Sequence, residues 1–438
     1  MKKNRLLALL VGVLLPLSGC TLFNDEDLKY ENHYNPPTTS NPDAIKVNGV
    51  EGVKTSYVED TMMFGDVYYG NDDDKVINTY KTGGVNANGL NVNENKDYDA
   101  NYDRNVYDLY VPDAAKKDEK QTVLLFIHGG AWVSGQKKDM NQYVLEYAGK
   151  GYITATMNYT LLSAGSLLSD GEASRDRSVF RDLDEIDACI ASIKASLVSL
   201  GYDATKLDLV IGGGSSGSHL TMLYTYSRGD KCPLPIKFIM NAVGPVSIKP
   251  DAWKQFKDET NEALDGQLTK ASIDEQAALS NIEELTISMT SWKWNEYQTM
   301  RIANGMCGFP GTPEQIASST NEDKKNIITP NDQTRAMTDA NGGEDQLSIP
   351  YWLNKNALAD KAKVPMVCAY AGMDRVVGIN QYATLSTALI AAGYTEGTNY
   401  KYVYFRNSGH TEINADKDAT AYNQLINYLD AWLTADSI

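Results

Sequence analysis

Residues 207–220 read LDLVIGGGSSGSHL, in which an apolar run passes directly into glycines and serines. The apolar part, Leu207–Ile211, predicts a buried strand, and the residues after the serines predict a helix. Between the two lies Gly-Gly-Ser-Ser-Gly at 213–217, which fits the pattern G-x-S-x-G. A serine on a sharp strand-to-helix turn needs small neighbours two positions away on either side, and the turn lifts its hydroxyl above the sheet. We therefore predict Ser215 as a nucleophile.

A second register of the same motif makes Ser216 the nucleophile. That register puts Ser218 where the second glycine belongs, so we prefer Ser215. On its own G-x-S-x-G is weak evidence, because glycine and serine are common in turns. The prediction therefore depends on the other motifs of the chain.

Another glycine-rich stretch lies upstream. Residues 123–127 read VLLFI, a continuous apolar strand, and HGGAW follows at once at 128–132. Glycines at such a position let the backbone approach a bound acyl group, so that N–H groups can face a developing oxyanion. The sequence thus places a nucleophile and a candidate oxyanion loop at the ends of two strands.

From about residue 106 onward, apolar strands alternate with helices. This alternation predicts an α/β protein with a mostly parallel sheet that is covered by helices on both faces. The helix expected at 180–200 is amphipathic, with Ile186, Ile190, Ile193 and Leu197 on one stripe. We also expect strands at 107–111, 152–157, 238–241, 364–370 and 402–405, and helices at 138–149, 379–392 and 417–435.

Two chemically active residues follow late strands. Asp374 lies in Ala-Gly-Met-Asp after the strand at 364–370, and His410 lies in Asn-Ser-Gly-His after the strand at 402–405. Open α/β sheets place their sites just beyond the carboxyl ends of strands. The chain order Ser, Asp, His is that of a triad built around a G-x-S-x-G nucleophile.

The chain has only four histidines, so few groups can serve as a general base. His33 lies in a polar N-terminal stretch. We expect His128 to hold its own loop by hydrogen bonding. His219 lies one helical turn past Ser215, and we expect it to face packing or an overlying segment. His410 is the fourth histidine.

HGGAW and GGSSGSHL together resemble the HGGG-type bacterial carboxylesterases and lipases of the α/β-hydrolase fold, especially the branch related to feruloyl and acetylxylan esterases. The resemblance covers roughly residues 106–245 and 350–435. It implies a catalytic triad of Ser215, Asp374 and His410. It also implies an oxyanion hole built from the amides of Gly129, Gly130 and Ser216. Ala131 stands where many members of the family have a third glycine.

Residues 246–350 interrupt the alternation, because they show helical patches and no convincing strand. A segment this long is functional or carries its own structure. We interpret it as an inserted, mainly helical cap over Ser215. Trp292 and Trp294 lie within it and are candidates to line a substrate pocket by stacking and burial. Packing of the cap against the core is the alternative use of these two residues.

The first twenty residues read MKKNRLLALLVGVLLPLSGC. A basic start and an apolar run of ten residues predict an export signal, because such a run is too short to cross a membrane. The ending Leu-Ser-Gly-Cys resembles the lipobox of bacterial lipoproteins. We expect removal of residues 1–19 and lipidation of Cys20. Residues 20–60 would then tether the domain to the bacterial cell envelope. An ordinary secretory signal that contains a cysteine is the alternative.

Composition excludes several classes of protein and of partner. A chain of 438 residues that is 42% hydrophobic and 22% charged is neither disordered nor fibrous. Its net charge of -17 would repel phosphate backbones, so we expect no nucleic-acid partner. We predict a hydrolase domain in two parts, 61–245 and 351–438, with membrane contact only through the lipid anchor. The oligomeric state stays open.

The cysteines and acidic clusters suggest no cofactor. Cys189 and Cys368 fall on an apolar helix stripe and inside a strand, and we expect both in the core. Cys232 and Cys307 lie in less regular stretches, and nothing in the sequence decides whether they form a disulfide. We find no cluster with metal-ligand spacing and expect neither a metal nor an organic cofactor.

We therefore predict a serine carboxylesterase that acts on small or carbohydrate-linked esters, including polysaccharide esters. One alternative is a serine peptidase or amidase, since the same triad serves both reactions on this fold. The other is a non-catalytic surface binding protein, because some proteins of this fold have lost their triad.

Overall fold

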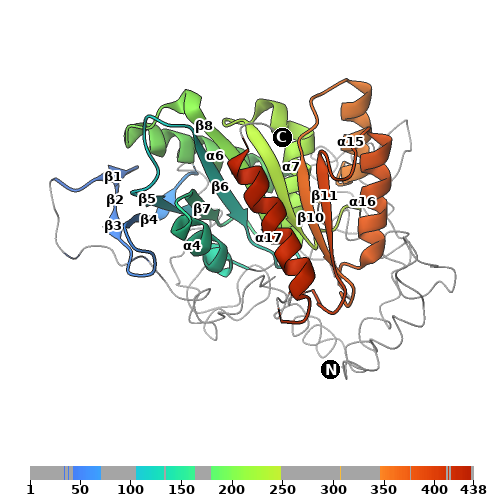
Figure 1. Ribbon diagram of the computed structural model, residues 1–438. Helices are drawn as coiled ribbons and strands as arrows, with labels where there is room; N and C mark the ends of the chain where they lie inside the picture. Colours follow the sequence, from blue (N-terminus) through green and yellow to red (C-terminus); the bar gives the residue numbers. More distant parts are fainter. Residues whose placement is uncertain are drawn as a thin grey trace, which may run out of the picture.

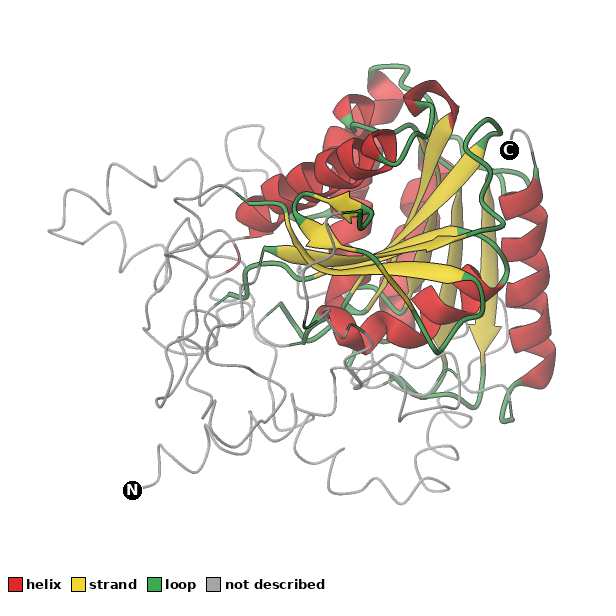
Figure 2. Ribbon diagram, turned by 90° about the vertical axis from the view of Figure 1, so that its left-hand side faces the viewer, coloured by secondary structure: helices red, strands yellow, loops and turns green. Residues whose placement is uncertain are grey.

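The computed structural model describes residues 34, 38, 43–70, 105–132, 135–162, 179–247, 306, 346–374, 376–410, 413 and 416–435. These residues form a twisted sheet of nine strands with helices on both sides (Figures 1 and 2). The strand order across the sheet is β11-β10-β9-β8-β6-β7-β5-β4-β3.

Six neighbouring strands of this sheet run parallel. They are β7 (Ile153–Met157), β6 (Gln121–Ile127), β8 (Leu207–Gly214), β9 (Ile236–Ala242), β10 (Met366–Ala371) and β11 (Tyr400–Phe405). Every residue of β7, β8 and β10 is buried, which explains why these strands read as continuous apolar or glycine-rich runs. The predicted strands of this part are confirmed, with ends that differ by no more than three residues.

The helices divide between the two faces of the sheet. Helices α4 (Asn141–Gly149) and α17 (Ala419–Thr434) pack on one face. The opposite face carries α6 (Val179–Ser199), α7 (Ser216–Arg228), α15 (Ile349–Leu358) and α16 (Ile379–Ala391). Figure 1 shows α17 crossing in front of the sheet, with α15 and α16 on the right, beside β10 and β11. This arrangement is the α/β-hydrolase fold that the motifs predict.

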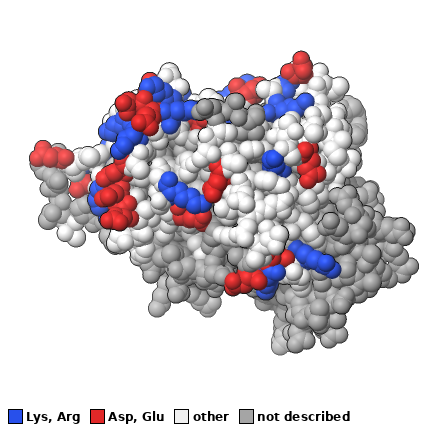
Figure 3. Space-filling view, viewed as in Figure 1, with Lys and Arg blue, Asp and Glu red and all other residues white. Residues whose placement is uncertain are grey.

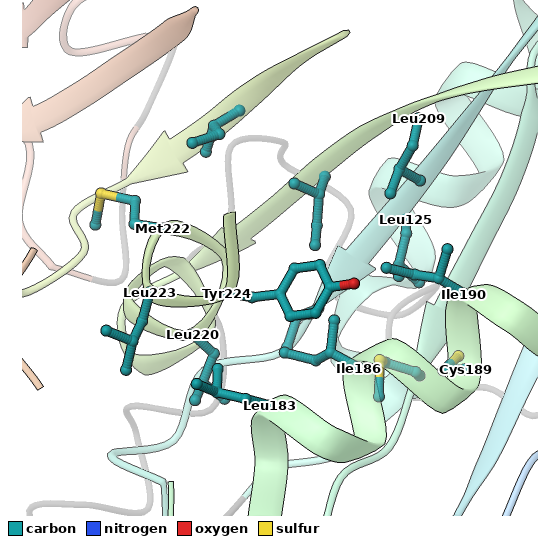
Figure 4. Close-up of a cluster of buried hydrophobic side chains, with 14 of the residues drawn as sticks. Leu125, Leu183, Ile186, Cys189, Ile190, Leu209, Leu220, Met222, Leu223 and Tyr224 are labelled. Carbon is teal, nitrogen blue, oxygen red and sulfur yellow. The ribbon is translucent and has the colours of Figure 1, made fainter. Parts of the chain in front are cut away.

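The larger core lies between α6, α7 and the sheet (Figure 4). Ile186 and Ile190 of α6 meet side chains of α7 and of the central strands, and all are fully buried. Burial of each such side chain contributes about 1.5–3 kcal/mol. Tyr224 of α7 reaches toward α6 and donates a hydrogen bond of 2.8 Å to Asp187 Oδ1. The predicted stripe of α6 and the core position of Cys189 are confirmed.

An antiparallel edge extends the sheet beyond the predicted strands. β5 (Val106–Pro112) pairs antiparallel with β7, and β4 (Thr61–Tyr68) pairs antiparallel with β5. β4 was not expected from the sequence. A register shift between Phe64 and Val67 breaks its alternation, which hides the strand from a search for a period of two.

Short strands also lie inside the stretch 20–60, where composition predicts a tether. β1 (Lys46–Val47) pairs with β2 (Val50–Glu51), and β3 (Val53–Lys54) joins the main sheet through β4. Val47 is buried against the core. The described residues 43–60 therefore belong to the edge of the domain rather than to a tether. Strands of two residues are too short to show any periodicity in the sequence.

The insertion leaves and re-enters the domain at one place. Ile349 N donates to Val246 O at 2.9 Å, so the two ends of the insertion lie next to each other. The buried side chain of Gln381 on α16 accepts from Val246 N and Ser247 N, at 2.8 and 3.0 Å, and donates to Ser247 O at 2.9 Å. We call residues 246–247 and 347–349 the insertion stem.

Several predictions fall outside the described residues. They concern the signal segment 1–19, Cys20, Trp292, Trp294, Cys307 and almost all of the cap at 246–350. Within the described part of the chain, no helix combines the length and apolarity needed to span a membrane.

Opposite charges are mixed on the described surface. On the face in Figure 3, Lys and Arg side chains lie among Asp and Glu side chains, beside broad uncharged areas. Ion pairs such as Lys54–Asp113 at 2.6 Å and Lys361–Asp230 at 3.1 Å join some of these charges. The view shows no continuous basic surface over the described residues, in keeping with the acidic composition.

Candidate active site

The nucleophile turn connects β8 to α7. Ser215 has a φ of +53° and a ψ of -124°, a conformation that non-glycine residues rarely adopt. Its amide donates to Ala242 O at 2.9 Å, which fixes the turn against β9. A Cβ atom on Gly217 would lie 2.1 Å from Ile127 O, and one on Gly213 would lie 2.6 Å from the carbonyl carbon of Gly217. The glycines of the motif are thus required by close backbone packing.

The sheet places this turn beside the candidate oxyanion loop. β6 has β7 on one side and β8 on the other, so the chain changes direction across the sheet at this point. Ile127 and Gly213 are paired residues near the carboxyl ends of β6 and β8. The loops that follow them therefore emerge side by side at a switch point, where open α/β sheets bind ligands.

The three predicted triad residues meet at this edge of the sheet. His410 Nε2 lies 2.9 Å from Ser215 Oγ, and His410 Nδ1 lies 2.6 Å from Asp374 Oδ2. All three side chains are buried, with Ser215 and His410 still 5% and 6% exposed. The imidazole therefore bridges a hydroxyl and a carboxylate in the geometry of a nucleophile, a base and an orienting acid.

The same geometry separates the two registers of the serine motif. Histidine reaches Ser215, whereas Ser216 Oγ is buried without a hydrogen-bond partner. Ser218 has a structural role, because its Oγ donates to Gly213 O and accepts from Ala242 N at 2.9 Å. Only the register centred on Ser215 brings a hydroxyl to a base.

Asp374 divides its two carboxylate oxygens between two tasks. Oδ1 accepts hydrogen bonds from the amides of Val376 and Val377, each at 2.8 Å, which leaves Oδ2 for His410. The acid turn is also tied to the histidine loop, since Met373 N donates to Ser408 O at 3.0 Å. These bonds hold the carboxylate in place before any substrate binds.

Asp418 supports the histidine loop, and no motif in the sequence points to it. Its carboxylate accepts from Asn407 N at 2.9 and 3.1 Å, from Asn407 Nδ2 at 3.0 Å and from Ser408 Oγ at 2.7 Å. Asp418 directly precedes α17, so the helix and the loop share one anchor. These hydrogen bonds hold the short loop that carries His410 in one position.

Gly129 brings the oxyanion loop against the nucleophile. A Cβ atom at this position would lie 2.9 Å from Gly214 O and 3.2 Å from Ser215 Cβ. Only glycine allows so close an approach of backbone to backbone. Ser216 is the first residue of α7, where amides have no acceptor within the helix and the helix dipole favours negative charge. Gly129 and Ser216 thus lie on two adjoining loops at the Ser215 turn.

Residues 158–162, which directly follow β7, fasten the oxyanion loop. Leu162 N donates to Trp132 O at 2.9 Å, and Asn158 Oδ1 accepts from Lys137 N at 2.7 Å. The Tyr159 ring stacks on the His128 imidazole at 4.3 Å between centroids. The Tyr159 hydroxyl also donates to His128 O at 3.3 Å. His128 is accordingly a structural residue of the loop, as the sequence predicts.

A buried ion cluster is centred on Lys137, which follows the oxyanion loop in the chain. Lys137 Nζ lies 2.6 Å from both oxygens of Asp108 and 3.0 Å from Asp66 Oδ1. Lys137 and Asp108 are almost fully buried. The ammonium lowers the pKa of Asp66, which favours the charged carboxylate. The cluster links the loop to β4 and β5, the strands of the antiparallel edge.

His219 lies on α7 behind the nucleophile. Its Nε2 is 2.8 Å from Leu347 O in the insertion stem, and its ring is fully buried. Burial lowers the pKa of His219 to about 4, so the imidazole is neutral at ordinary pH. Its ring packs edge-on against Trp132 at 5.3 Å between centroids. The side chain thus faces packing and the insertion, as predicted.

The described residues offer no other reactive centre of comparable composition. Among them, no group of three or more His, Cys, Asp or Glu side chains is arranged to hold a metal ion. Cys368 is buried in β10, as expected, and Cys232 is half-buried. The possible pairing of Cys232 with Cys307 involves a residue outside the described part.

Residues 107–282 match the family model BD-FAE, an esterase family of the α/β-hydrolase fold. The matched segment contains the oxyanion loop and the Ser215 turn, and it ends before Asp374 and His410. The match covers less than half of the chain. No curated protein matches the chain in sequence.

Several solved esterases are similar to this chain. Esterase B from Lactobacillus rhamnosis is 12% identical, with 86% of this chain and 87% of that chain covered and a TM-score of 0.46. Esterase 2 from Thermogutta terrifontis, phosphoramylated by tabun, is 14% identical, with 75% and 89% covered and a TM-score of 0.41. A bifunctional GH43-CE protein from Bacteroides eggerthii is 14% identical, with 85% and 35% covered and a TM-score of 0.44.

Proposed function

We propose that this α/β-hydrolase domain, which matches the BD-FAE esterase family over residues 107–282, is a serine carboxylesterase. One observation carries the proposal. His410 lies 2.9 Å from a serine hydroxyl and 2.6 Å from a carboxylate, on loops that leave the carboxyl ends of three different strands. The substrates would be small or carbohydrate-linked esters.

In the first half of the reaction, Ser215 Oγ forms a bond to the ester carbonyl carbon while His410 Nε2 takes the hydroxyl proton. Asp374 holds the imidazole through Nδ1 and stabilises the imidazolium that forms. The carbonyl oxygen becomes an oxyanion near the amides of Gly129, Gly130 and Ser216. Each such donor contributes on the order of 10² to 10³ in kcat.

Collapse of the tetrahedral intermediate breaks the bond to the alcohol oxygen, and His410 returns its proton to the departing alcohol. Water then attacks the acyl-serine carbonyl, with His410 again accepting a proton. The second collapse restores Ser215 and releases the carboxylic acid. These steps are assigned to side chains and backbone amides of the chain.

Active-site titration tests the proposal directly. A fluorescent alkyl phosphonate should label the protein with one equivalent, and Ser215→Ala should abolish labelling. Ser215→Ala, His410→Ala and the double variant should each lose about 10⁴-fold or more in kcat, because triad residues act as a unit. Retained activity in Ser215→Ala together with inactivity of Ser216→Ala would contradict the assignment.

Substrate comparison separates the competing functions. Chromogenic esters from acetyl to octanoyl would be assayed beside feruloyl esters, acetylated xylan and a chromogenic peptide amide. Hydrolysis of the esters alone supports an esterase, and faster turnover of the amide supports a peptidase. A protein that is neither labelled nor active on any substrate would be a binding protein.

We propose Trp292 and Trp294 as substrate-binding residues of the inserted segment. The support is their position in sequence, because the insertion stem lies where the chain leaves the carboxyl end of β9, next to the Ser215 turn. Trp292→Ala and Trp294→Ala should alter the preference between acetyl and longer esters. Equal losses on every ester, accompanied by a lower melting temperature, would show that both residues are structural.

We also propose that the chain is an exported lipoprotein held to the bacterial envelope through Cys20. The support is the sequence 1–20, with its basic start, apolar run and Leu-Ser-Gly-Cys ending. Metabolic labelling with an alkyne fatty acid should mark the wild-type protein and leave Cys20→Ala unmarked. Label that persists in Cys20→Ala would overturn the anchor.

A further inference from the structure

The oxyanion loop contains an uncommon run of backbone conformations. Gly130, Ala131 and Trp132 have φ angles of +117°, +50° and +63°. Glycine adopts such angles readily, whereas each non-glycine residue there costs about 1–3 kcal/mol unless its surroundings fix it. Ala131 and Trp132 are therefore strained residues next to the amides proposed to bind the oxyanion.

The strained pair is held mainly through Trp132. Its carbonyl accepts from Leu162 N at 2.9 Å, which fixes the backbone on one side. Its indole is buried and packs against the His219 ring at an interplanar angle of 89° and a centroid distance of 5.3 Å. Perpendicular aromatic pairs of this kind add stabilisation beyond the area that they bury.

His219 is itself fixed at two points. Its amide donates to Ser215 O at 3.1 Å, in the first turn of α7. Its Nε2 lies 2.8 Å from the Leu347 carbonyl, which can only accept, so the ring carries its proton on Nε2. His219 thus contacts the Ser215 turn through its backbone amide, and the oxyanion loop and the insertion stem through its imidazole.

We propose that His219 is a positioning residue for the esterase reaction, one that fixes the oxyanion loop against the Ser215 turn. It acts by bracing Trp132, and through Trp132 it holds the amides of Gly129 and Gly130 in register with Ser215 Oγ. It neither touches the substrate nor transfers a proton, since His410 is the base. The inference rests on the function proposed above.

Substitutions of His219 can remove its ring contact with Trp132 and its hydrogen bond to Leu347 O separately or together. His219→Phe keeps a ring against Trp132 and removes the hydrogen bond to Leu347 O, while His219→Gln keeps a donor and removes the ring. His219→Leu removes both. A displaced oxyanion donor should lower kcat and leave KM within about threefold. We expect a roughly 10- to 100-fold loss of kcat for His219→Leu, with smaller losses for the other two.

A double-mutant cycle with Trp132 measures whether the kcat losses of the two residues are coupled. A merely structural role of His219 would not produce such coupling. Trp132→Leu should lower kcat to a similar extent, and the His219→Leu, Trp132→Leu double variant should be no slower than the worse single variant. The rate of phosphonate labelling should fall in parallel with kcat. Melting temperatures identify variants that stay folded, and His219→Phe with Trp132→Phe form the cycle if a leucine variant does not fold.

The outcomes distinguish this inference from the function on which it rests. Failure of the phosphonate to label the wild-type protein would overturn the esterase itself. Normal labelling of the wild type, together with folded His219 variants whose kcat stays within twofold, would overturn the positioning role alone. Losses of kcat that multiply in the double variant would also overturn it, because the two residues would then act independently.

Discussion

Gly129 is the residue at which the proposed oxyanion hole can be tested with one added methyl group. In Gly129→Ala the new Cβ would lie 2.9 Å from Gly214 O and 3.2 Å from Ser215 Cβ, so backbone must move. We expect kcat to fall on the order of 10²-fold or more, as on loss of an oxyanion donor. The free energy of unfolding should fall by only about 1–3 kcal/mol.

Gly149 provides the matched control for this substitution. A Cβ there would meet only a Val58 methyl group at 3.9 Å, which is ordinary contact. Gly149→Ala should therefore keep both kcat and stability. A Gly129→Ala enzyme with wild-type kcat would show that the loop can move without loss of catalysis.

Asp418 carries a second prediction at the residue scale. Asp418→Ala removes the carboxylate that accepts from Asn407 N and Ser408 Oγ, and each such lost hydrogen bond costs about 1–3 kcal/mol where the donor stays buried. The histidine loop should loosen, so kcat should fall about tenfold or more, with a smaller loss for Asp418→Asn. Stopped-flow ester hydrolysis and urea unfolding measure the two effects.

Asp430 on α17 is the control for Asp418. It is exposed and lies 3.5 Å from Lys150 Nζ, a surface pair of small energetic value. Asp430→Asn should leave kcat unchanged and alter stability by less than about 0.5 kcal/mol. Equal effects of the two substitutions would remove the role assigned to Asp418.

At the scale of elements, the Lys137 cluster joins the oxyanion loop to the antiparallel edge. Lys137→Met leaves the Asp108 carboxylate buried without its partner, and such a change costs about 3–5 kcal/mol. Asp108→Asn should also lower stability, because the buried Lys137 ammonium then loses the negative charge of Asp108. The double variant buries neither charge and should be less unstable than the sum of the single losses, as measured by urea unfolding. Strictly additive losses would show that the two side chains are not coupled.

The elements also show what the sequence can and cannot predict. The central strands and their helices were predictable, because buried parallel strands read as apolar runs and α6 has a clear apolar stripe. The three candidate triad residues could be located because each lies within five residues of the end of a strand. β4 was missed because a bulge interrupts its pattern, and β1, β2 and β3 were missed because they are too short.

The supporting residues of the site were missed for a different reason. Asp418, Lys137 and Asn158 act through contacts with residues 10 to 71 positions away, and those contacts exist only in the folded chain. A lone Asp, Lys or Asn in a sequence looks the same as a solvated one. Motifs identify the reacting groups, whereas the groups that hold them in place emerge from the tertiary structure.

At the scale of the whole molecule, His219 makes stability depend on pH. Its pKa is about 4 in the folded protein and about 6.5 in the unfolded chain, so the unfolded state binds the extra proton between these values. Stability is therefore fully present above about pH 6.5 and is lost as the pH falls toward 4. The loss from this group is about 1.4 kcal/mol per pH unit.

His219→Gln cannot titrate and isolates this contribution. Urea unfolding between pH 7 and pH 4.5 should show that the free energy of unfolding falls less steeply for the variant. The difference in slope should approach about 1.4 kcal/mol per pH unit, which is what one proton contributes. His128 is unsuitable as a control, because it belongs to the oxyanion loop. Parallel curves for wild type and variant would mean that the imidazole is reached by solvent and protonated in the folded protein.

The insertion stem has a consequence for how such a protein can evolve. Its two ends meet at a single backbone hydrogen bond of 2.9 Å, so the sheet and its helices join directly across the gap. Closing even a fully flexible loop twice as long adds only about 0.6 kcal/mol of entropy cost. Changes of length between the two ends should therefore cost the hydrolase core little, provided that Met306, which is buried in the larger core, is kept. Evolution can therefore change the residues around Ser215 while the sheet and the helices that position this serine stay the same.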